Sequence, residues 1–176
     1  DVGNAYLEAL TNELIYFVAG PEFAAFGLEG HTMILFKALY GLKSSGQEWH
    51  KVMSKTLKAE GFKNSLGDPD VWMRKHLELK IWEYICVYVD DLALALVDGT
   101  AFLKKLQLSI EEGGYGYKIK GDGPLIFHLG CDYYRDADGT LVYQPKKYIV
   151  KMMEAYVRYF KQKPKHYSSP LPSDDH

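Results

Sequence analysis

Residues 84–96 read Tyr-Ile-Cys-Val-Tyr-Val-Asp-Asp-Leu-Ala-Leu-Ala-Leu, and this stretch decides the fold prediction. Two adjacent carboxylates, Asp90 and Asp91, interrupt a run that is otherwise apolar and rich in residues that favour strands. The pattern predicts two buried strands joined by a tight hairpin at the acidic pair. Two interpretations of the pair remain open. Asp is common in turns because its side chain bonds nearby backbone, and two carboxylates on rigid strands can also bind Mg²⁺ and a substrate phosphate.

The composition is that of one domain with a hydrophobic core: the chain has 176 residues, of which 47% are apolar. The formal net charge of −2 does not by itself indicate a nucleic-acid binder. Cys86 and Cys131 lie in apolar, strand-like stretches, which favours reduced core thiols of an intracellular protein over a disulfide. Since no apolar run reaches the ~18 residues of a membrane span, we expect no membrane association.

The remaining hydrophobic pattern mixes helical and extended stretches. Helices are expected around residues 49–62, 102–113 and 148–160, and a short helical stretch is expected through Leu10 and Leu14. Strands are expected at residues 15–18, 33–39 and 71–73, with a hairpin over 126–144 that turns at Asp138-Gly139. Because strands and helices do not strictly alternate, the expected class is α+β. We expect a largely antiparallel sheet, packed by about three helices, with the 84–96 hairpin at its centre.

Tyr88-Val89-Asp90-Asp91 between two apolar strands resembles the Tyr-X-Asp-Asp hairpin of reverse transcriptases, the RNA-directed DNA polymerases. Five further blocks stand in the order that the copia-type LTR retrotransposon members of this family would require. They are Asp1-Val2-Gly3-Asn4-Ala5-Tyr6, Leu39-Tyr40-Gly41-Leu42-Lys43 with Trp49, Gly61-Phe62-Lys63 with Asp68-Pro69, Gly123-Pro124 with Phe127-His128-Leu129-Gly130, and Asp138-Gly139-Thr140-Leu141 with Gln144 and Lys147-Tyr148. The resemblance covers residues 1 to about 172. One departure is Ser44-Ser45-Gly46, where the family usually has Gln-Ala-Pro.

The resemblance implies a polymerase palm that transfers nucleotides to a primer 3′-hydroxyl by two-metal catalysis. The implied catalytic and metal-binding residues are Asp1, Asp90 and Asp91, with two Mg²⁺ ions as cofactors and Mn²⁺ as a substitute. The implied substrate-binding residues are Val2, Tyr6, Tyr40, Gly41 and Tyr88. Tyr6 would be the aromatic gate that excludes a 2′-hydroxyl; the alternative is an ordinary core tyrosine.

The nucleic-acid contacts implied by the resemblance are Lys43, Phe127, Leu129, Gly130, Lys147 and Lys151. A plain hairpin strand remains an alternative for residues 127–130. Between Gln144 and His166, seven Lys or Arg residues oppose one acid, Glu154, and form either a phosphate-binding stripe or a solvated face. The implied partners are an RNA template, a DNA or RNA primer, deoxynucleoside triphosphates, and the ribonuclease H and integrase regions of the same polyprotein.

The implied domains are a palm over residues 1–145, truncated at its N-terminus, the start of the thumb over 146–163, and a flexible linker over 164–176. The implied location is a cytoplasmic virus-like particle, with the nucleus as a further site. We expect residues 1–176 alone not to polymerise, because the fingers would precede Asp1 and the strand of Asp1 would lack its sheet pairing. The alternatives are a non-catalytic relic that binds RNA–DNA hybrid or a protein, and a template-independent or RNA-only polymerase.

Overall fold

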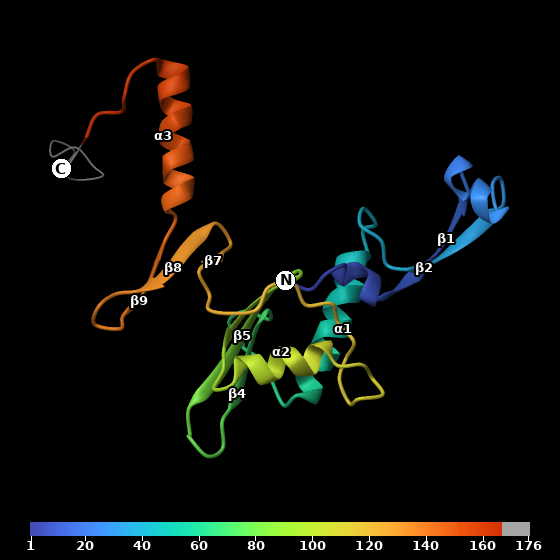
Figure 1. Cartoon of the computed structure of the whole chain (residues 1–176), viewed down its shortest axis with the longest axis horizontal. Helices are drawn as coiled ribbons and strands as arrows, with labels where there is room; N and C mark the ends of the chain where they lie inside the picture. The colour runs from blue at the N-terminus through green and yellow to red at the C-terminus, as the bar shows by residue number, and fades with distance from the viewer. Residues whose placement is uncertain (167–176) are drawn as a thin grey trace. The chain divides into compact units, whose positions relative to one another are not determined.

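The computed structural model describes residues 1–166 and divides the chain into two compact units (Figure 1). The first unit runs over Asp1–Gly123 and the second begins at Pro124. The expected start of the thumb at residue 146 therefore lies inside the second unit. Residues 167–176, which make up most of the expected linker, lie outside the described residues.

A four-stranded antiparallel sheet forms the framework of the first unit. Its strands are β3 (Lys63–Asn64), β4 (Val71–Lys75), β5 (Trp82–Tyr88) and β6 (Asp91–Ala95), in that order. Along β5, Glu83, Ile85 and Val87 are buried while the residues between them are exposed, so one face of the sheet carries the core. The β5–β6 hairpin ends this strand order, which corrects the expectation of a central hairpin. The segment around Val2 meets the turn through a single hydrogen bond and not through a strand ladder.

Helices α1 (Ser45–Ala59) and α2 (Gly99–Gln107) bury their apolar residues in one cluster with this sheet. From α1 the cluster receives Trp49, Met53 and Leu57, whose spacing places them on one helical face. The helix ends as expected, because Gly61 takes a left-handed φ of 83° and the Phe62 N–H returns to the Leu57 carbonyl.

Helix α2 ends at Gln107, earlier than the expected end at Gly113-Gly114. Leu108 takes an extended ψ of 144°, and its carbonyl accepts a hydrogen bond from the Gly116 N–H at 2.7 Å. A Cβ at Gly114 would lie 2.2 Å from the Leu108 carbonyl oxygen, so only glycine fits this turn. The two glycines therefore belong to a compact turn after the helix.

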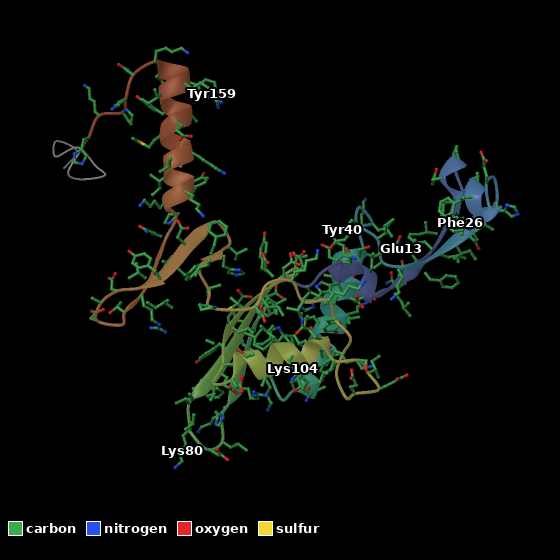
Figure 2. All side chains as sticks on the ribbon, viewed as in Figure 1. Glu13, Phe26, Tyr40, Lys80, Lys104 and Tyr159 are labelled. Atoms are coloured by element: carbon green, nitrogen blue, oxygen red, sulfur yellow. The ribbon has the colours of Figure 1, made fainter. Side chains whose placement is uncertain are left out.

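The chain between Ala5 and Lys37 folds as a two-stranded hairpin with two short 3₁₀ segments. Its elements are η1 (Ala5–Glu8), β1 (Leu10–Val18), η2 (Pro21–Phe26) and β2 (Thr32–Lys37). The helical stretch expected through Leu10 and Leu14 is wrong, since both residues lie in β1. Their side chains are 66% and 69% exposed, so the apolar spacing does not mark a buried helical face. Figure 2 marks Phe26, which is 75% exposed in the same hairpin.

The second unit combines a small antiparallel sheet with one helix. The sheet consists of β7 (Phe127–His128), β8 (Cys131–Arg135) and β9 (Leu141–Gln144), and α3 (Lys146–Phe160) follows it. Leu129 and Gly130 form the first turn with φ values of 48° and 82°, the positive pair that favours two-residue hairpin loops. The expected turn at Asp138-Gly139 and the expected third helix are both confirmed.

The two cysteines are free thiols, but they are not core residues as expected. Cys86 is exposed because it falls on the outward alternation of β5, and Cys131 is partly exposed. Within residues 1–166, no helix has both the length and the apolar character needed to cross a membrane.

Candidate active site

The acidic pair lies at the turn of the β5–β6 hairpin. Tyr88 pairs with Asp91, so Val89 and Asp90 form the two-residue loop between the strands. Val89 has a φ of 56°, a left-handed conformation that β-branched residues rarely adopt. Asp90 and Asp91 are each partly exposed, and Tyr88 is 58% exposed. Both acidic residues therefore remain partly accessible to solvent at the end of a paired hairpin.

The N-terminal segment is hydrogen-bonded directly to this turn. The Val2 N–H donates to the Asp90 carbonyl at 2.6 Å. On the other side, the Lys120 N–H donates to the Asp1 carbonyl at 2.8 Å, and the Asp1 ammonium group donates to the Lys120 carbonyl at 3.2 Å. Among the described residues, the segment of Asp1 forms no strand ladder, but it keeps one isolated bridge from Val2 to Ile119, so the expected loss of its pairing is only partly correct. The backbone of Asp1 is held next to that of Asp90.

Val2 itself does not have the position expected of a substrate-binding residue. Its side chain is fully buried in the core cluster, and its N–H is bonded to the Asp90 carbonyl. Neither group is left for a substrate. The role of Val2 in this structure is to connect the N-terminal segment to the acidic turn.

The described residues contain no group of three or more His, Cys, Asp or Glu side chains positioned to hold a metal ion. The backbone segments of Asp1, Asp90 and Asp91 thus lie next to each other in space. Their three side chains do not by themselves form a complete set of metal ligands. Mg²⁺ in phosphoryl-transfer sites binds one or two carboxylates together with substrate phosphates. The donor chemistry of the turn therefore fits a magnesium ion that is completed by substrate.

The structure brings Tyr6 and Tyr40 together beside the turn. Their rings stack with centroids 4.4 Å apart. Tyr40, which is labelled in Figure 2, is 52% exposed. A small cavity of about 160 Å³ is lined by Tyr6, Trp49 and Val89, among others. Tyr6 thus lines the same cavity as Val89, the turn residue with the left-handed φ. Gly41 follows Tyr40 with a φ of 99°, which a residue with a side chain rarely adopts.

Trp49 is a site residue whose role sequence reasoning missed. Its indole Nε1–H donates a hydrogen bond to the Val89 carbonyl at 2.5 Å, although the two residues are 40 positions apart. The sequence marks Trp49 only as a core position of a helix and as part of a family block. Nothing in its helical spacing signals a donor directed at the turn.

Glu83 is a buried residue at the start of β5, at the end of the hairpin that lies away from the acidic turn. Its carboxylate accepts hydrogen bonds from Arg74 Nε and Nη2 at 2.9 and 2.7 Å and from the Val97 N–H at 3.0 Å. Burial alone would raise the pKa of Glu83, but these hydrogen bonds and the Arg74 charge outweigh it and hold the pKa below its ordinary value. The carboxylate is therefore charged and fully partnered at neutral pH.

Two of the expected nucleic-acid contacts meet in the second unit. The Lys147 Nζ lies 4.5 Å from the centroid of the Phe127 ring and 3.4 Å from Asp132 Oδ1. Leu129 and Gly130 form the adjacent β7–β8 turn, and Lys151 is exposed one helical turn after Lys147. In the first unit, Lys43 is exposed just before α1.

Residues 1–160 match a family model described as "Reverse transcriptase (RNA-dependent DNA polymerase)". The chain belongs to the reverse transcriptase family. This membership confirms the resemblance drawn from the sequence blocks, and the structure confirms the α+β class with antiparallel sheets.

The curated relatives of this reverse transcriptase chain are retrotransposon proteins. The chain is 27% identical to the Retrovirus-related Pol polyprotein from transposon RE1 of Arabidopsis thaliana, over 87% of the chain and 10% of the polyprotein. It is 29% identical to the transposon Ty5-1 protein of Saccharomyces cerevisiae, over 97% of the chain and 54% of that protein. The corresponding polyprotein from transposon TNT 1-94 of Nicotiana tabacum is 26% identical over 89% of the chain and 11% of its own length. No solved structure matches the chain.

Proposed function

We propose that the chain supplies the catalytic palm of an RNA-directed DNA polymerase encoded within a retrotransposon polyprotein. The observation that carries this proposal is the hydrogen bond from the Val2 N–H to the Asp90 carbonyl. It joins two acidic segments that stand far apart in the sequence and that both match blocks of the reverse transcriptase family. The family match over residues 1–160 supports the reaction class.

The proposed reaction is attack of a primer 3′-hydroxyl on the α-phosphate of a deoxynucleoside triphosphate, with pyrophosphate as the leaving group. Asp1, Asp90 and Asp91 would hold two Mg²⁺ ions, which stabilise charge on the attacking and leaving oxygens when bound. The hairpin supplies two of these carboxylates from one tight turn. The paired N-terminal segment supplies the third, because Lys120 holds the Asp1 backbone from the other side.

In this proposal, Tyr6 selects deoxyribonucleotides over ribonucleotides. The Tyr6 ring is stacked on Tyr40 and lines the cavity that Val89 also lines. The stacking restricts movement of the Tyr6 ring away from a bound nucleotide. A wall of this kind rejects an additional 2′-hydroxyl by steric exclusion. Gly41 allows the backbone to approach a nucleotide closely.

The proposed partners are an RNA template, its primer and the incoming nucleotides. Phe127, Leu129 and Gly130 would hold the primer through packing and backbone contacts, which carry no sequence information. Lys43, Lys147 and Lys151 would contact phosphates. The ribonuclease H and integrase regions of the polyprotein belong to the same proposal.

A second candidate is a module that binds RNA–DNA hybrid or a protein without catalysis. The observation that favours it is the Lys147 ammonium 4.5 Å from the Phe127 ring centroid with Lys151 exposed nearby on α3, since basic and aromatic side chains bind nucleic acid without a metal. In the second candidate, the chain binds nucleic acid and this binding does not depend on Asp90. In the first candidate, nucleotide transfer requires Asp90.

The deciding experiment compares wild type with Asp90→Asn and, as a matched control, with Asp136→Asn in the exposed β8–β9 turn. Each protein is expressed as residues 1–176 and also with the adjoining reading frame. Asp90→Asn should lower primer extension by more than about a hundredfold and weaken Mn²⁺ binding, because it removes a carboxylate charge where the metals act. Asp136→Asn should change neither. Wild-type binding of hybrid without extension in either form would instead favour the second candidate.

A further inference from the structure

Trp49 connects helix α1 to the acidic turn. The residue is 2% exposed, and its indole N–H donates to the Val89 carbonyl at 2.5 Å. That carbonyl belongs to the peptide whose other end is the Asp90 nitrogen. The orientation of this peptide determines where Asp90 lies, so the indole acts on Asp90 through the backbone.

The turn requires such support because its geometry is unfavourable by itself. Val89 is a β-branched residue with a φ of 56°, and such residues keep a left-handed conformation only when their surroundings enforce it. The next carbonyl, that of Asp90, accepts a hydrogen bond from the Val2 N–H at 2.6 Å. Two distant segments of the chain therefore hold the two consecutive carbonyls of the turn.

Trp49 is itself held in place within the core. Its ring meets that of Tyr117 edge to face with centroids 5.7 Å apart. The Tyr117 hydroxyl is hydrogen-bonded at 2.7 Å to Thr56 Oγ1, which lies about two helical turns after Trp49 on α1. Because the Trp49 indole N–H is held in one position, it can hydrogen-bond the Val89 carbonyl in only one orientation of the Val89–Asp90 peptide.

We infer that Trp49 is a positioning residue of the acidic turn: its indole N–H fixes the Val89–Asp90 peptide and thereby the Asp90 carboxylate. The catalytic meaning of this inference rests on the proposed polymerase function, whereas the effect on the turn does not. Removal of the N–H leaves the Val89 carbonyl facing an apolar ring without its donor, which favours other peptide orientations.

The test uses residues 1–176 with three changes. Trp49→Phe keeps an aromatic ring and removes the donor, and 3-benzothienylalanine at position 49 keeps the size of the indole while replacing the N–H by sulfur. Tyr115→Phe is the control, since it removes a different hydrogen bond of the same unit, the one from the Tyr115 hydroxyl to Glu60 Oε1 at 2.6 Å. NMR hydrogen exchange of the Asp90 and Asp91 amides reports on the turn, and paramagnetic relaxation reports Mn²⁺ affinity.

Both changes at position 49 should accelerate exchange of the turn amides roughly tenfold, the scale of one lost hydrogen bond, and weaken Mn²⁺ binding by a similar factor. Tyr115→Phe should lower the melting temperature without either effect. The inference is overturned if the benzothienyl variant exchanges like wild type, or if Tyr115→Phe accelerates the same amides equally. If wild type binds no Mn²⁺, the proposed function fails, and the exchange rates alone still decide the role of Trp49.

Discussion

In the first unit, α1, α2 and the β3–β6 sheet enclose one continuous cluster of buried apolar side chains, from Val2 to Tyr117. In the described part of the second unit, residues 124–166, every residue remains at least partly exposed. Helix α3 nevertheless has as clear an apolar face as α1. On α1 this face is covered by the sheet, whereas on α3 Ile149 and Met152 are 51% and 55% exposed. An amphipathic pattern thus identifies the apolar face of a helix without identifying what covers it.

Separation of the chain at the unit boundary should give the largest effect. We expect residues 1–123 to unfold cooperatively near the midpoint of the whole chain, because they contain the complete buried cluster. We expect residues 124–176 to show no cooperative transition, because a three-stranded sheet and one helix without buried side chains cannot offset their conformational entropy. Circular dichroism during thermal unfolding measures both. A sharp transition in residues 124–176 would contradict the contrast.

Truncation of one apolar side chain in each unit should sharpen the same contrast. Leu57→Ala removes a fully buried side chain and should lower the unfolding free energy of the first unit by about 2–5 kcal/mol. Met153→Ala removes a side chain that is 45% exposed and should change that transition by less than about 0.5 kcal/mol. Urea titration followed by tryptophan fluorescence measures the difference. Equal effects would show that the two faces are equally covered.

The pH dependence of stability should belong to the first unit. The pKa of Glu83 lies below its ordinary value of 4.5 in the folded state, so the unfolded state binds more protons as the pH falls. The stabilisation is present above about pH 4.5 and is lost as the pH falls through the folded-state pKa. Glu83→Gln should lower the free energy of unfolding by about 2 kcal/mol at pH 7, because Arg74 loses a charged partner. It should also reduce the fall in this free energy between neutral and acid pH.

The control for this prediction is Glu111→Gln, which changes an exposed acid in the turn after α2. Its unfolding free energy should follow that of wild type across pH 3–7. Glu83 is not the group responsible if the unfolding free energy of wild type does not fall at acid pH, or if that of Glu83→Gln falls by the same amount.

Charge reversal on α3 should give the smallest effect and concerns binding only. Lys151→Glu should lower the slope of log affinity for primer–template against log salt by about one unit. Lys147→Glu should lower it less, because Asp132 already lies 3.4 Å from the Lys147 ammonium. Lys104→Glu on α2 is the control and should leave the slope unchanged. If all three variants behave alike, the basic stripe is solvated surface.

Local chemistry made several elements predictable. The spacing of Trp49, Met53 and Leu57 with Gly61 after them gives α1 and its end, and Asp138-Gly139 gives the turn of the second sheet. The acidic pair gives the position of the β5–β6 turn. The family blocks identify the reverse transcriptase family, because their order along the chain is far more specific than any one of them.

Long-range contacts account for the elements that could not be predicted. Leu10 and Leu14 have helical spacing, but β2 pairs with their segment and fixes it as a strand. The end of α2 depends on a bond from Gly116 back to the Leu108 carbonyl. At the site, the bonds that join Val2 to Asp90 and Trp49 to Val89 connect residues with no local relation. Periodicity and propensity carry no information on such pairs.

The pairing of Asp1–Gly3 with Lys118–Lys120 has a consequence for how the chain folds during synthesis. The hydrogen bond from Asp1 to Lys120 spans 119 positions, so it cannot form until almost the whole first unit has left the ribosome. Contacts of such large sequence separation form late, because loop closure must come before the gain they provide. We therefore expect residues 1–3 to be fixed late in the folding of the first unit. The β5–β6 hairpin can form earlier, because its two strands are adjacent in the sequence.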